Sequence, residues 1–199
     1  MALIWPASVK PVTVRYRPIR PRRSFVSPLS GDETMRVSPF SKFEIEATFK
    51  PLRSAQAWDA ISAILLSETD VVRFPFCLPG HASGTANLQA TGSNSNLVVT
   101  QVGTGAASRP LINGGSGFKA GQNLSLIHNG TNYLYTVAAN QVDNNVLLTS
   151  RLRGGPIGSN IVIAYNPPFI EGELDEDSRS ISRDDANFYG FTIRLRELK

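Results

Sequence analysis

Four short apolar segments separated by strong turn signals constrain the fold of this chain more than any other feature. The segments span residues 123–127, 133–138, 146–149 and 160–165. The turn signals between them are Asn129-Gly130, Asp143-Asn144-Asn145 and Gly154-Gly155-Pro156. These residue combinations favour tight hairpin turns. Short strands at such regular spacing predict a small β-barrel or sandwich over this part of the chain.

The first thirty residues contain five prolines, which exclude a long helix and interrupt any strand. Within them, Val12, Val14 and Tyr16 alternate with polar residues, which is the two-residue period of a half-buried strand. After the turn at residues 30–32, the alternation returns over residues 35–49. We therefore predict an extended arm or edge segment, followed by an antiparallel strand with one solvent-exposed face.

Helical periodicity follows Ser54, a residue that can cap a helix N-terminus. Apolar residues then recur every three or four positions, at Ala57, Trp58, Ile61, Ile64 and Leu65. We predict an amphipathic helix from Ser54 to Glu68 that packs on the sheet through Trp58, Ile61 and Leu65. Short strands are expected at residues 71–76 and, closing the same domain, at 188–198.

The composition changes to Gly, Ser, Thr, Asn and Ala over residues 81–116, where one segment, 97–102, has a strand pattern. Breakers at Pro79-Gly80 and Pro167-Pro168 bound this region and the β unit after it. The predicted fold is mainly β: a β-sandwich-like domain with one α-helix, formed by residues 1–80 and 167–199, and an inserted small β-barrel at 81–166. The breakers predict that the inserted unit is separable.

The net charge of +4 is unevenly distributed. Residues 10–23 carry six bases and no acid, whereas residues 171–177 carry five acids and no base. This asymmetry indicates a charge-steered contact, with two solvated faces as the alternative. The candidate interface residues are Arg15, Arg17, Arg20, Arg22, Arg23, Glu171, Glu173 and Asp175. Because only Tyr16 and Phe25 could stack bases nearby, we expect no nucleic-acid specificity.

No residue pattern supports catalysis. The chain has one cysteine, Cys77, and two histidines, His81 and His128, that lack partners at metal-ligand spacing. Its Gly-rich segments at 103–105 and 114–117 lack the lysine and the helix of a phosphate-binding loop, and no nucleophile elbow occurs. We therefore expect no enzyme activity, metal or cofactor. No apolar run is long enough for a membrane helix, and no export signal is expected.

Several segments, taken in order, resemble the distal tail proteins of long-tailed bacteriophages and related gene transfer agents. They are residues 23–31 (RSFVSPLSG), the helix around Ala57-Trp58, Val72-Arg73-Phe74, residues 121–126 and 133–137 of the insertion, and the segment 146–153. The resemblance implies a homo-oligomeric ring of six copies that joins the tail tube protein to the baseplate hub protein. It also implies a virion protein, made in the cytoplasm of the bacterial host, that displays the inserted barrel on the outside of the ring.

Two further hypotheses stay open. One is a baseplate module that binds a receptor or carbohydrate, in which Tyr133 and Tyr135 contact a glycan of the host surface. The other is a tail-tube or tail-terminator subunit, which forms rings but normally lacks an inserted barrel. Exposed aromatic side chains on one face of the barrel would favour the first of these.

Overall fold

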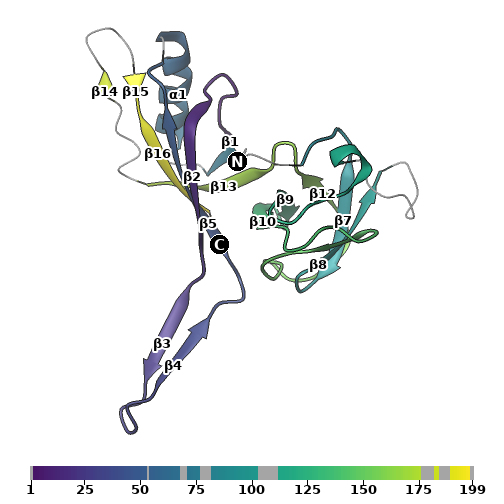
Figure 1. Ribbon diagram of the computed structural model, residues 1–199. Helices are drawn as coiled ribbons and strands as arrows, with labels where there is room; N and C mark the ends of the chain where they lie inside the picture. Colours follow the sequence, from purple (N-terminus) through teal and green to yellow (C-terminus); the bar gives the residue numbers. More distant parts are fainter. Residues whose placement is uncertain are drawn as a thin grey trace.

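The computed structural model describes residues 2–52, 54–67, 71–76, 82–102, 112–175, 182–183 and 189–197. Over these residues the chain is mainly β, with one α-helix and a curled half-barrel sheet, so the predicted fold class is confirmed. Two six-stranded sheets lie side by side, and a long β-hairpin extends away from both (Figure 1). Residues 182–183 and 189–190 form two further short strands, β14 (Ser182–Arg183) and β15 (Tyr189–Gly190), that pair with each other.

The first sheet combines strands from both ends of the chain. Its order is β1 (Leu3–Ile4), β6 (Val72–Pro75), β13 (Phe169–Leu174), β16 (Thr192–Glu197), β5 (Lys42–Phe49) and β2 (Pro11–Ile19). β1 and β6 are parallel, and the other neighbours are antiparallel. The proline-rich segment is therefore an edge strand, β2, which is the position in a sheet that tolerates Pro11 and Pro18.

The core of the first sheet is aromatic. Phe43, Ile45, Ala47 and Phe49 of β5 are buried on one face, as their alternation predicted. Trp5 lies at the centre, with its ring centroid 5.4 Å from that of Phe49 and 5.5 Å from that of Phe74. Its indole N–H donates a hydrogen bond of 3.0 Å to the carbonyl of Val9, so the one polar atom of this side chain is satisfied.

Helix α1 (Ser54–Leu66) packs on this core with a different side from the one predicted. Its buried side chains are those of Ala57, Ala60, Ala63 and Ile64. Trp58 is 65% exposed and Leu65 is 62% exposed, and Ile61 is only half-buried, so the predicted packing through these residues is wrong. Because large aromatic rings already fill the core, the small alanine side chains allow the helix to approach it closely.

The second sheet has the order β10 (Thr131–Thr136), β9 (Asn123–His128), β12 (Ile157–Ala164), β7 (Leu88–Ser93), β8 (Asn96–Gln101) and β11 (Asn145–Leu147). It surrounds a separate core that includes Leu97, Leu124 and Tyr135. A 3₁₀ turn, η1 (Asn113–Gly115), lies beside it. The turn Asn129-Gly130 joins β9 to β10 with φ values of 51° and 76°, as a tight hairpin of this type requires. Strand β7, whose sequence is rich in small polar residues, was not predicted.

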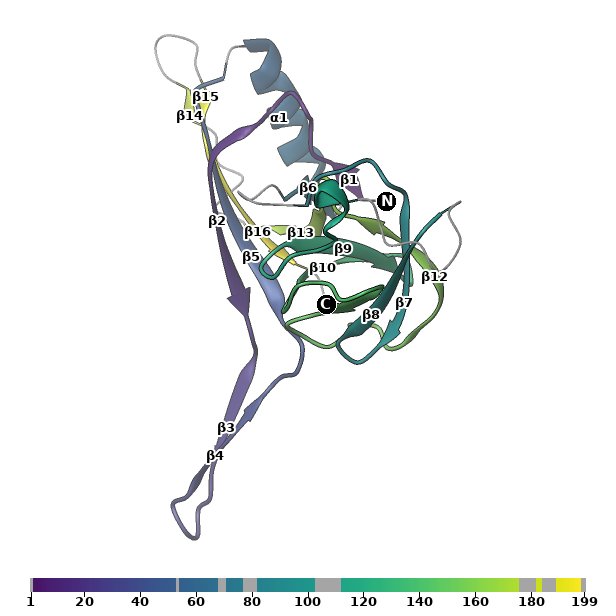
Figure 2. The ribbon, with the colours of Figure 1, turned by 45° about the vertical axis from the view of Figure 1, so that its right-hand side comes forward.

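The protruding hairpin consists of β3 (Arg22–Val26) and β4 (Glu33–Val37). These strands pair only with each other, and every residue in them is exposed. Figures 1 and 2 show the hairpin extending well beyond the two sheets. Residues 35–49 were predicted as one strand, which is wrong: the chain leaves the hairpin after Val37 and enters the first sheet only at Lys42. Pro39, which lies between the two strands, cannot donate a ladder hydrogen bond.

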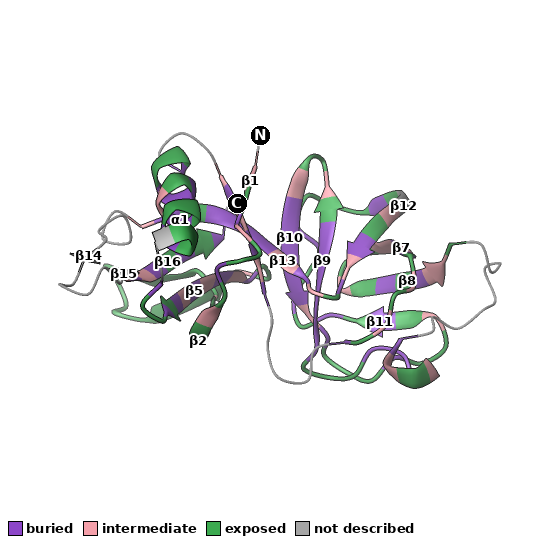
Figure 3. Cartoon of the chain, turned by 90° about the horizontal axis from the view of Figure 1, so that it is seen from above, coloured by how far each residue is buried: buried purple, intermediate pink, exposed green. Residues whose placement is uncertain are grey.

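The two sheets meet where β10 approaches β13 (Figure 3). β10 is an edge strand of the second sheet, so its outer N–H groups need acceptors from elsewhere. The N–H of Asn132 donates to Glu171 (2.9 Å), and that of Leu134 donates to Glu197 (2.8 Å). Both carboxylates belong to the first sheet, and the side chain of Leu134 belongs to its core cluster. Polar and apolar contacts therefore join the two sheets.

Arg153 completes this junction. Its guanidinium donates to Glu197 (2.5 Å) and to the carbonyl of Leu134 (2.9 Å), and it lies over the rings of Tyr133 (4.8 Å) and Tyr135 (5.3 Å). The backbone N–H of Arg153 also donates to the Tyr135 hydroxyl (2.8 Å). Burial raises the pKa of the Glu197 carboxyl, and Arg153 opposes that rise. Burial likewise raises the pKa of the Tyr135 hydroxyl.

Candidate assembly surface

Charged side chains alternate in sign across three neighbouring strands of the first sheet. In β5 and β16 they lie on the face opposite the core, because they alternate along the strand with buried apolar residues. The arginines of β2 lie opposite the glutamates of β5 in the strand register. Each of two glutamates in β5 is opposite an arginine of β2 and an arginine of β16: Glu46 is opposite Arg15 and Arg194, and Glu44 is opposite Arg17 and Arg196. Together with Tyr16 and Asp175, these residues line a pocket of about 390 Å³.

Ion pairs form on this face between arginines and the two glutamates of β5. Arg17 contacts Glu44 at 2.5 Å, Arg194 contacts Glu46 at 3.3 Å, and Arg196 contacts Glu44 at 3.8 Å. Arg15 and Arg17 are thus not part of a free basic arm, since they lie in an edge strand beside glutamates. Exposed pairs of this kind contribute only about 0–1 kcal/mol each. The face is therefore better suited to orienting a charged partner than to holding it.

The acidic stretch is divided between the interior and the surface. Glu171 is buried, and it accepts hydrogen bonds from the Arg73 guanidinium (2.7 Å from Nε) and from Asn132. The prediction that Glu171 belongs to an exposed acidic surface is wrong, because β13 is an interior strand of its sheet and meets β10. Glu173 is exposed opposite Arg196, and Asp175 is half-buried. Residues 176 and 177 lie outside the described residues.

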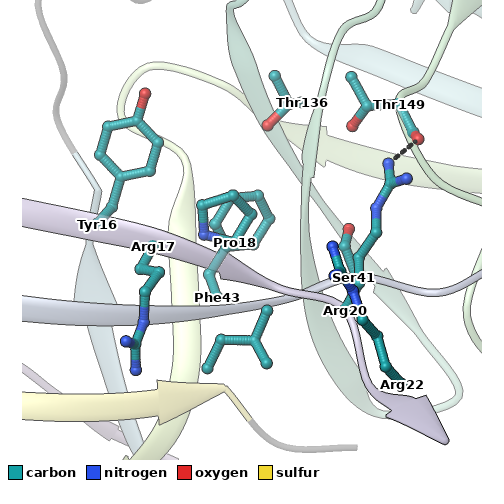
Figure 4. Close-up of a pocket in the computed structure, with 10 residues that line it drawn as sticks. Tyr16, Arg17, Pro18, Arg20, Arg22, Ser41, Phe43, Thr136 and Thr149 are labelled. Carbon is teal, nitrogen blue, oxygen red and sulfur yellow. Dashed lines mark hydrogen bonds between the residues drawn. The ribbon is translucent and has the colours of Figure 1, made fainter. Parts of the chain in front are cut away.

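A larger pocket, of about 670 Å³, separates the end of β2 from the second sheet. Arg17, Arg20 and Arg22 line it, together with Ser41, Phe43, Thr136 of β10 and Thr149, which follows β11. Figure 4 shows Tyr16 and Arg17 on one side, with Arg20 and Arg22 on the other. The Arg20 guanidinium donates to the Thr149 carbonyl (2.9 Å), which ties the base of the hairpin to the second sheet. This pocket carries a concentration of cationic donors suited to carboxylate groups.

The hairpin combines cations with exposed apolar side chains. Arg22 and Arg23 lie in β3, as does Phe25, which is 58% exposed. The other exposed apolar residues are Val26, Leu29, Met35 and Val37. Sequence reasoning found the arginines and the turn at residues 30–32 but did not identify the hairpin. The signal that could have found it is that turn between two short alternating segments, with Pro39 ending the second.

Tyr133 and Tyr135 cannot contact a glycan in this structure. They are 8% and 1% exposed, and both rings stack on the Arg153 guanidinium. The sequence of residues 133–137 predicts a strand, but it does not show that neighbouring segments bury the side chains on both faces of that strand, β10. Exposed aromatic rings at this place, which the glycan hypothesis needs, are therefore not present.

Within the described ranges, no group of three or more His, Cys, Asp or Glu side chains is arranged to hold a metal ion. His128 is half-buried, with Nδ1 3.4 Å from the Arg153 carbonyl oxygen. Cys77 and His81 lie outside the described residues. No described helix is long and apolar enough to cross a bilayer.

Comparison with known proteins leaves the family open. No model of a known protein family matches the chain, and a search of curated proteins finds no significant match. The function must therefore be inferred from the surfaces described above.

Proposed function

We propose that this protein is a structural subunit of a bacteriophage tail, which assembles with copies of itself into the distal ring between the tail tube and the baseplate hub. The observation that carries the proposal is the hairpin β3–β4, whose ten strand residues are all exposed although several are large and apolar. An isolated two-stranded hairpin is marginally stable in water. An exposed apolar surface of this kind is typical of a protein–protein contact.

The placement of the family-like segments supports the same proposal. Residues 23–31, which carry the first of these segments, form most of β3 and the following turn. Ala57-Trp58 lies in α1, and Val72-Arg73-Phe74 lies in β6. These three segments thus belong to the hairpin, the helix and the first sheet, which are the elements that a ring-forming domain would use, and the segments 121–126, 133–137 and 146–153 belong to the inserted unit. The second sheet, with its own core, would project from such a ring.

The alternatives have less support. A glycan-binding baseplate module would need aromatic side chains that this chain buries at Tyr133 and Tyr135. A tail-tube or terminator ring could use the same hairpin, but it would leave the second sheet without a role. Arg20, Arg22 and Arg23 are candidate contacts to the tail tube protein or the hub protein in the proposed assembly.

The proposal is tested by electron microscopy and light scattering of the purified protein over a range of concentrations. We expect closed rings with a central hole, and co-purification with the tail tube protein or hub protein of the same phage. Reversing Arg20, Arg22 and Arg23 to Glu should weaken this assembly most at low salt, where charges are least screened. A protein that remains monomeric at every concentration, alone and with both partners, overturns the proposal.

A further inference from the structure

The exposed face of α1 carries three large apolar side chains among polar ones: Trp58, Leu65 and Leu66. Trp58 and Leu65 are seven residues apart, so they lie on the same side of the helix, and Leu66 extends this surface with 55% exposure. Asp59 is the one charged residue of α1, and it lies beside Trp58 on the exposed side. Its Oδ2 accepts a hydrogen bond from the Ser8 hydroxyl (3.0 Å), which helps to hold the carboxylate in place.

The hairpin presents the opposite charge in an unfavourable arrangement. Arg23 of β3 is directly opposite Arg36 of β4, and both side chains are exposed. Like charges directly opposite each other destabilise an antiparallel pair. Phe25 and its cross-strand partner Thr34 lie on the same face of the hairpin, next to these arginines. One face of the hairpin therefore presents an aromatic ring beside two arginines. A carboxylate placed between the two arginines would relieve their repulsion.

These two surfaces cannot meet within one molecule. Figures 1 and 2 show α1 at one end of the first sheet and the hairpin extending from the other. Each surface has what the other lacks: an acid beside a tryptophan on the helix, and two arginines beside a phenylalanine on the hairpin. A second copy of the chain can supply the counterpart to both.

We propose that the hairpin β3–β4 of one copy docks on the exposed face of α1 of a second copy, with Phe25 against Trp58 and with Asp59 between Arg23 and Arg36. The contact joins two different surfaces, so every copy can accept one neighbour and donate to another, and a closed ring results when the rotation allows it. This inference rests on the proposed self-assembly and identifies the surfaces that make it.

Tryptophan fluorescence tests the contact directly. The chain has two tryptophans, and Trp5 is already buried whereas Trp58 is exposed. We expect the emission of the wild-type protein to shift to shorter wavelength as copies assemble, and the Trp58→Phe variant to lose this shift while Trp5 still reports folding. Rings whose emission does not change on assembly overturn the docking contact but leave the proposed function standing. A wild-type chain that never assembles overturns both.

Charge exchange provides the second arm of the test. We consider two variants: the hairpin double variant Arg23→Glu with Arg36→Glu, and the helix variant Asp59→Arg. Each should raise the concentration needed for assembly by about tenfold or more, because each places like charges at the contact. All three changes in one chain should restore assembly. The control variant is Lys119→Glu with Arg151→Glu, which makes the same charge change as the hairpin double variant at two exposed sites of the inserted unit. It should assemble like the wild-type protein.

Circular dichroism must show that each variant is folded, and Asp59→Lys replaces Asp59→Arg if the latter is not. The contact is overturned if the triple variant does not recover assembly. It is also overturned if both charge-reversed variants assemble as readily as the wild-type protein, even when rings form.

Discussion

At the scale of single residues, the most consequential group is the carboxylate of Glu197. It accepts hydrogen bonds from the backbone N–H groups of Phe43 (2.9 Å) and Leu134 (2.8 Å), and it forms an ion pair with Arg153. Both members of this pair are almost fully buried. Breaking a buried pair by removing one partner leaves a charge without compensation, which costs far more than losing a surface pair.

We predict that Glu197→Gln lowers the free energy of unfolding by about 3–5 kcal/mol, because Arg153 loses its counter-charge and the amide group meets N–H donors. Glu173→Gln is the matched control, since Glu173 is exposed one strand away, and it should change stability by less than about 0.5 kcal/mol. Urea denaturation followed by circular dichroism measures both. Equal midpoints for the two variants would contradict a stabilising role for the pair.

At the scale of elements, α1 and the hairpin each combine a structural role with an exposed apolar surface. The helix stabilises the first sheet through its alanines and leaves Trp58 in solvent. The two ends of the hairpin lie next to each other, since the N–H of Ser38 donates a hydrogen bond to the carbonyl of Pro21 (2.9 Å). Neither exposed surface is needed to complete the core of its own molecule.

We predict that Trp58→Ala changes the free energy of unfolding of the monomer by less than about 0.5 kcal/mol, as is usual for exposed positions. Phe74→Ala should instead cost about 3–5 kcal/mol, because Phe74 is buried against Trp5 and its removal leaves a cavity. Thermal unfolding of both variants at concentrations below assembly is the measurement. A large loss of stability in Trp58→Ala would show that the tryptophan packs inward.

We also predict that the hairpin can be removed without loss of the fold. Replacing residues 22–37 with a short Asn-Gly turn should leave the melting temperature of the monomer almost unchanged, since every strand residue deleted is exposed. The same variant should not form oligomers, as sedimentation velocity can measure. Normal assembly of the shortened chain would locate the contact elsewhere.

At the scale of the whole molecule, the two sheets are less independent than the breakers at their boundaries suggest. Leu134 of the second sheet packs in the core of the first, and the first sheet supplies the carboxylates that pair with β10. Separability of residues 82–165 stays a prediction, and the structure adds a condition to it. The first sheet without its neighbour should fold with a lower free energy of unfolding than the full chain.

A linker variant tests this coupling. With residues 82–165 replaced by a short Gly/Ser linker, we expect Glu197→Gln to become almost neutral, because Arg153 and Leu134 are gone and water reaches the carboxylate. In the full chain the same change should be strongly destabilising. Similar costs in both backgrounds would mean that Glu197 does not act through the junction, and loss of all soluble protein would show one continuous core.

The positions and types of most elements follow from the sequence alone. The strands β5 and β16, the helix α1 and the turn at Asn129-Gly130 were all predicted, because alternation, helical spacing and turn chemistry are properties of neighbouring residues. The concentration of arginines in the candidate surface was also visible, since charge can be counted along the chain. The strand β7 was missed because its sequence is rich in small polar residues. The hairpin was missed because the alternation over residues 35–49 continues from β4 into β5 and hides the break between them.

Which side of each element faces inward was decided only by the tertiary structure. α1 has two apolar sides, and the sequence does not show that a crowded aromatic core accepts the alanine side. Glu171 reads as a surface acid until Arg73, 98 residues away, and the edge of β10 are placed beside it. Glu197 and Arg153 are likewise 44 residues apart. Local patterns encode secondary structure, whereas the burial of a charge depends on partners that only the folded chain brings together.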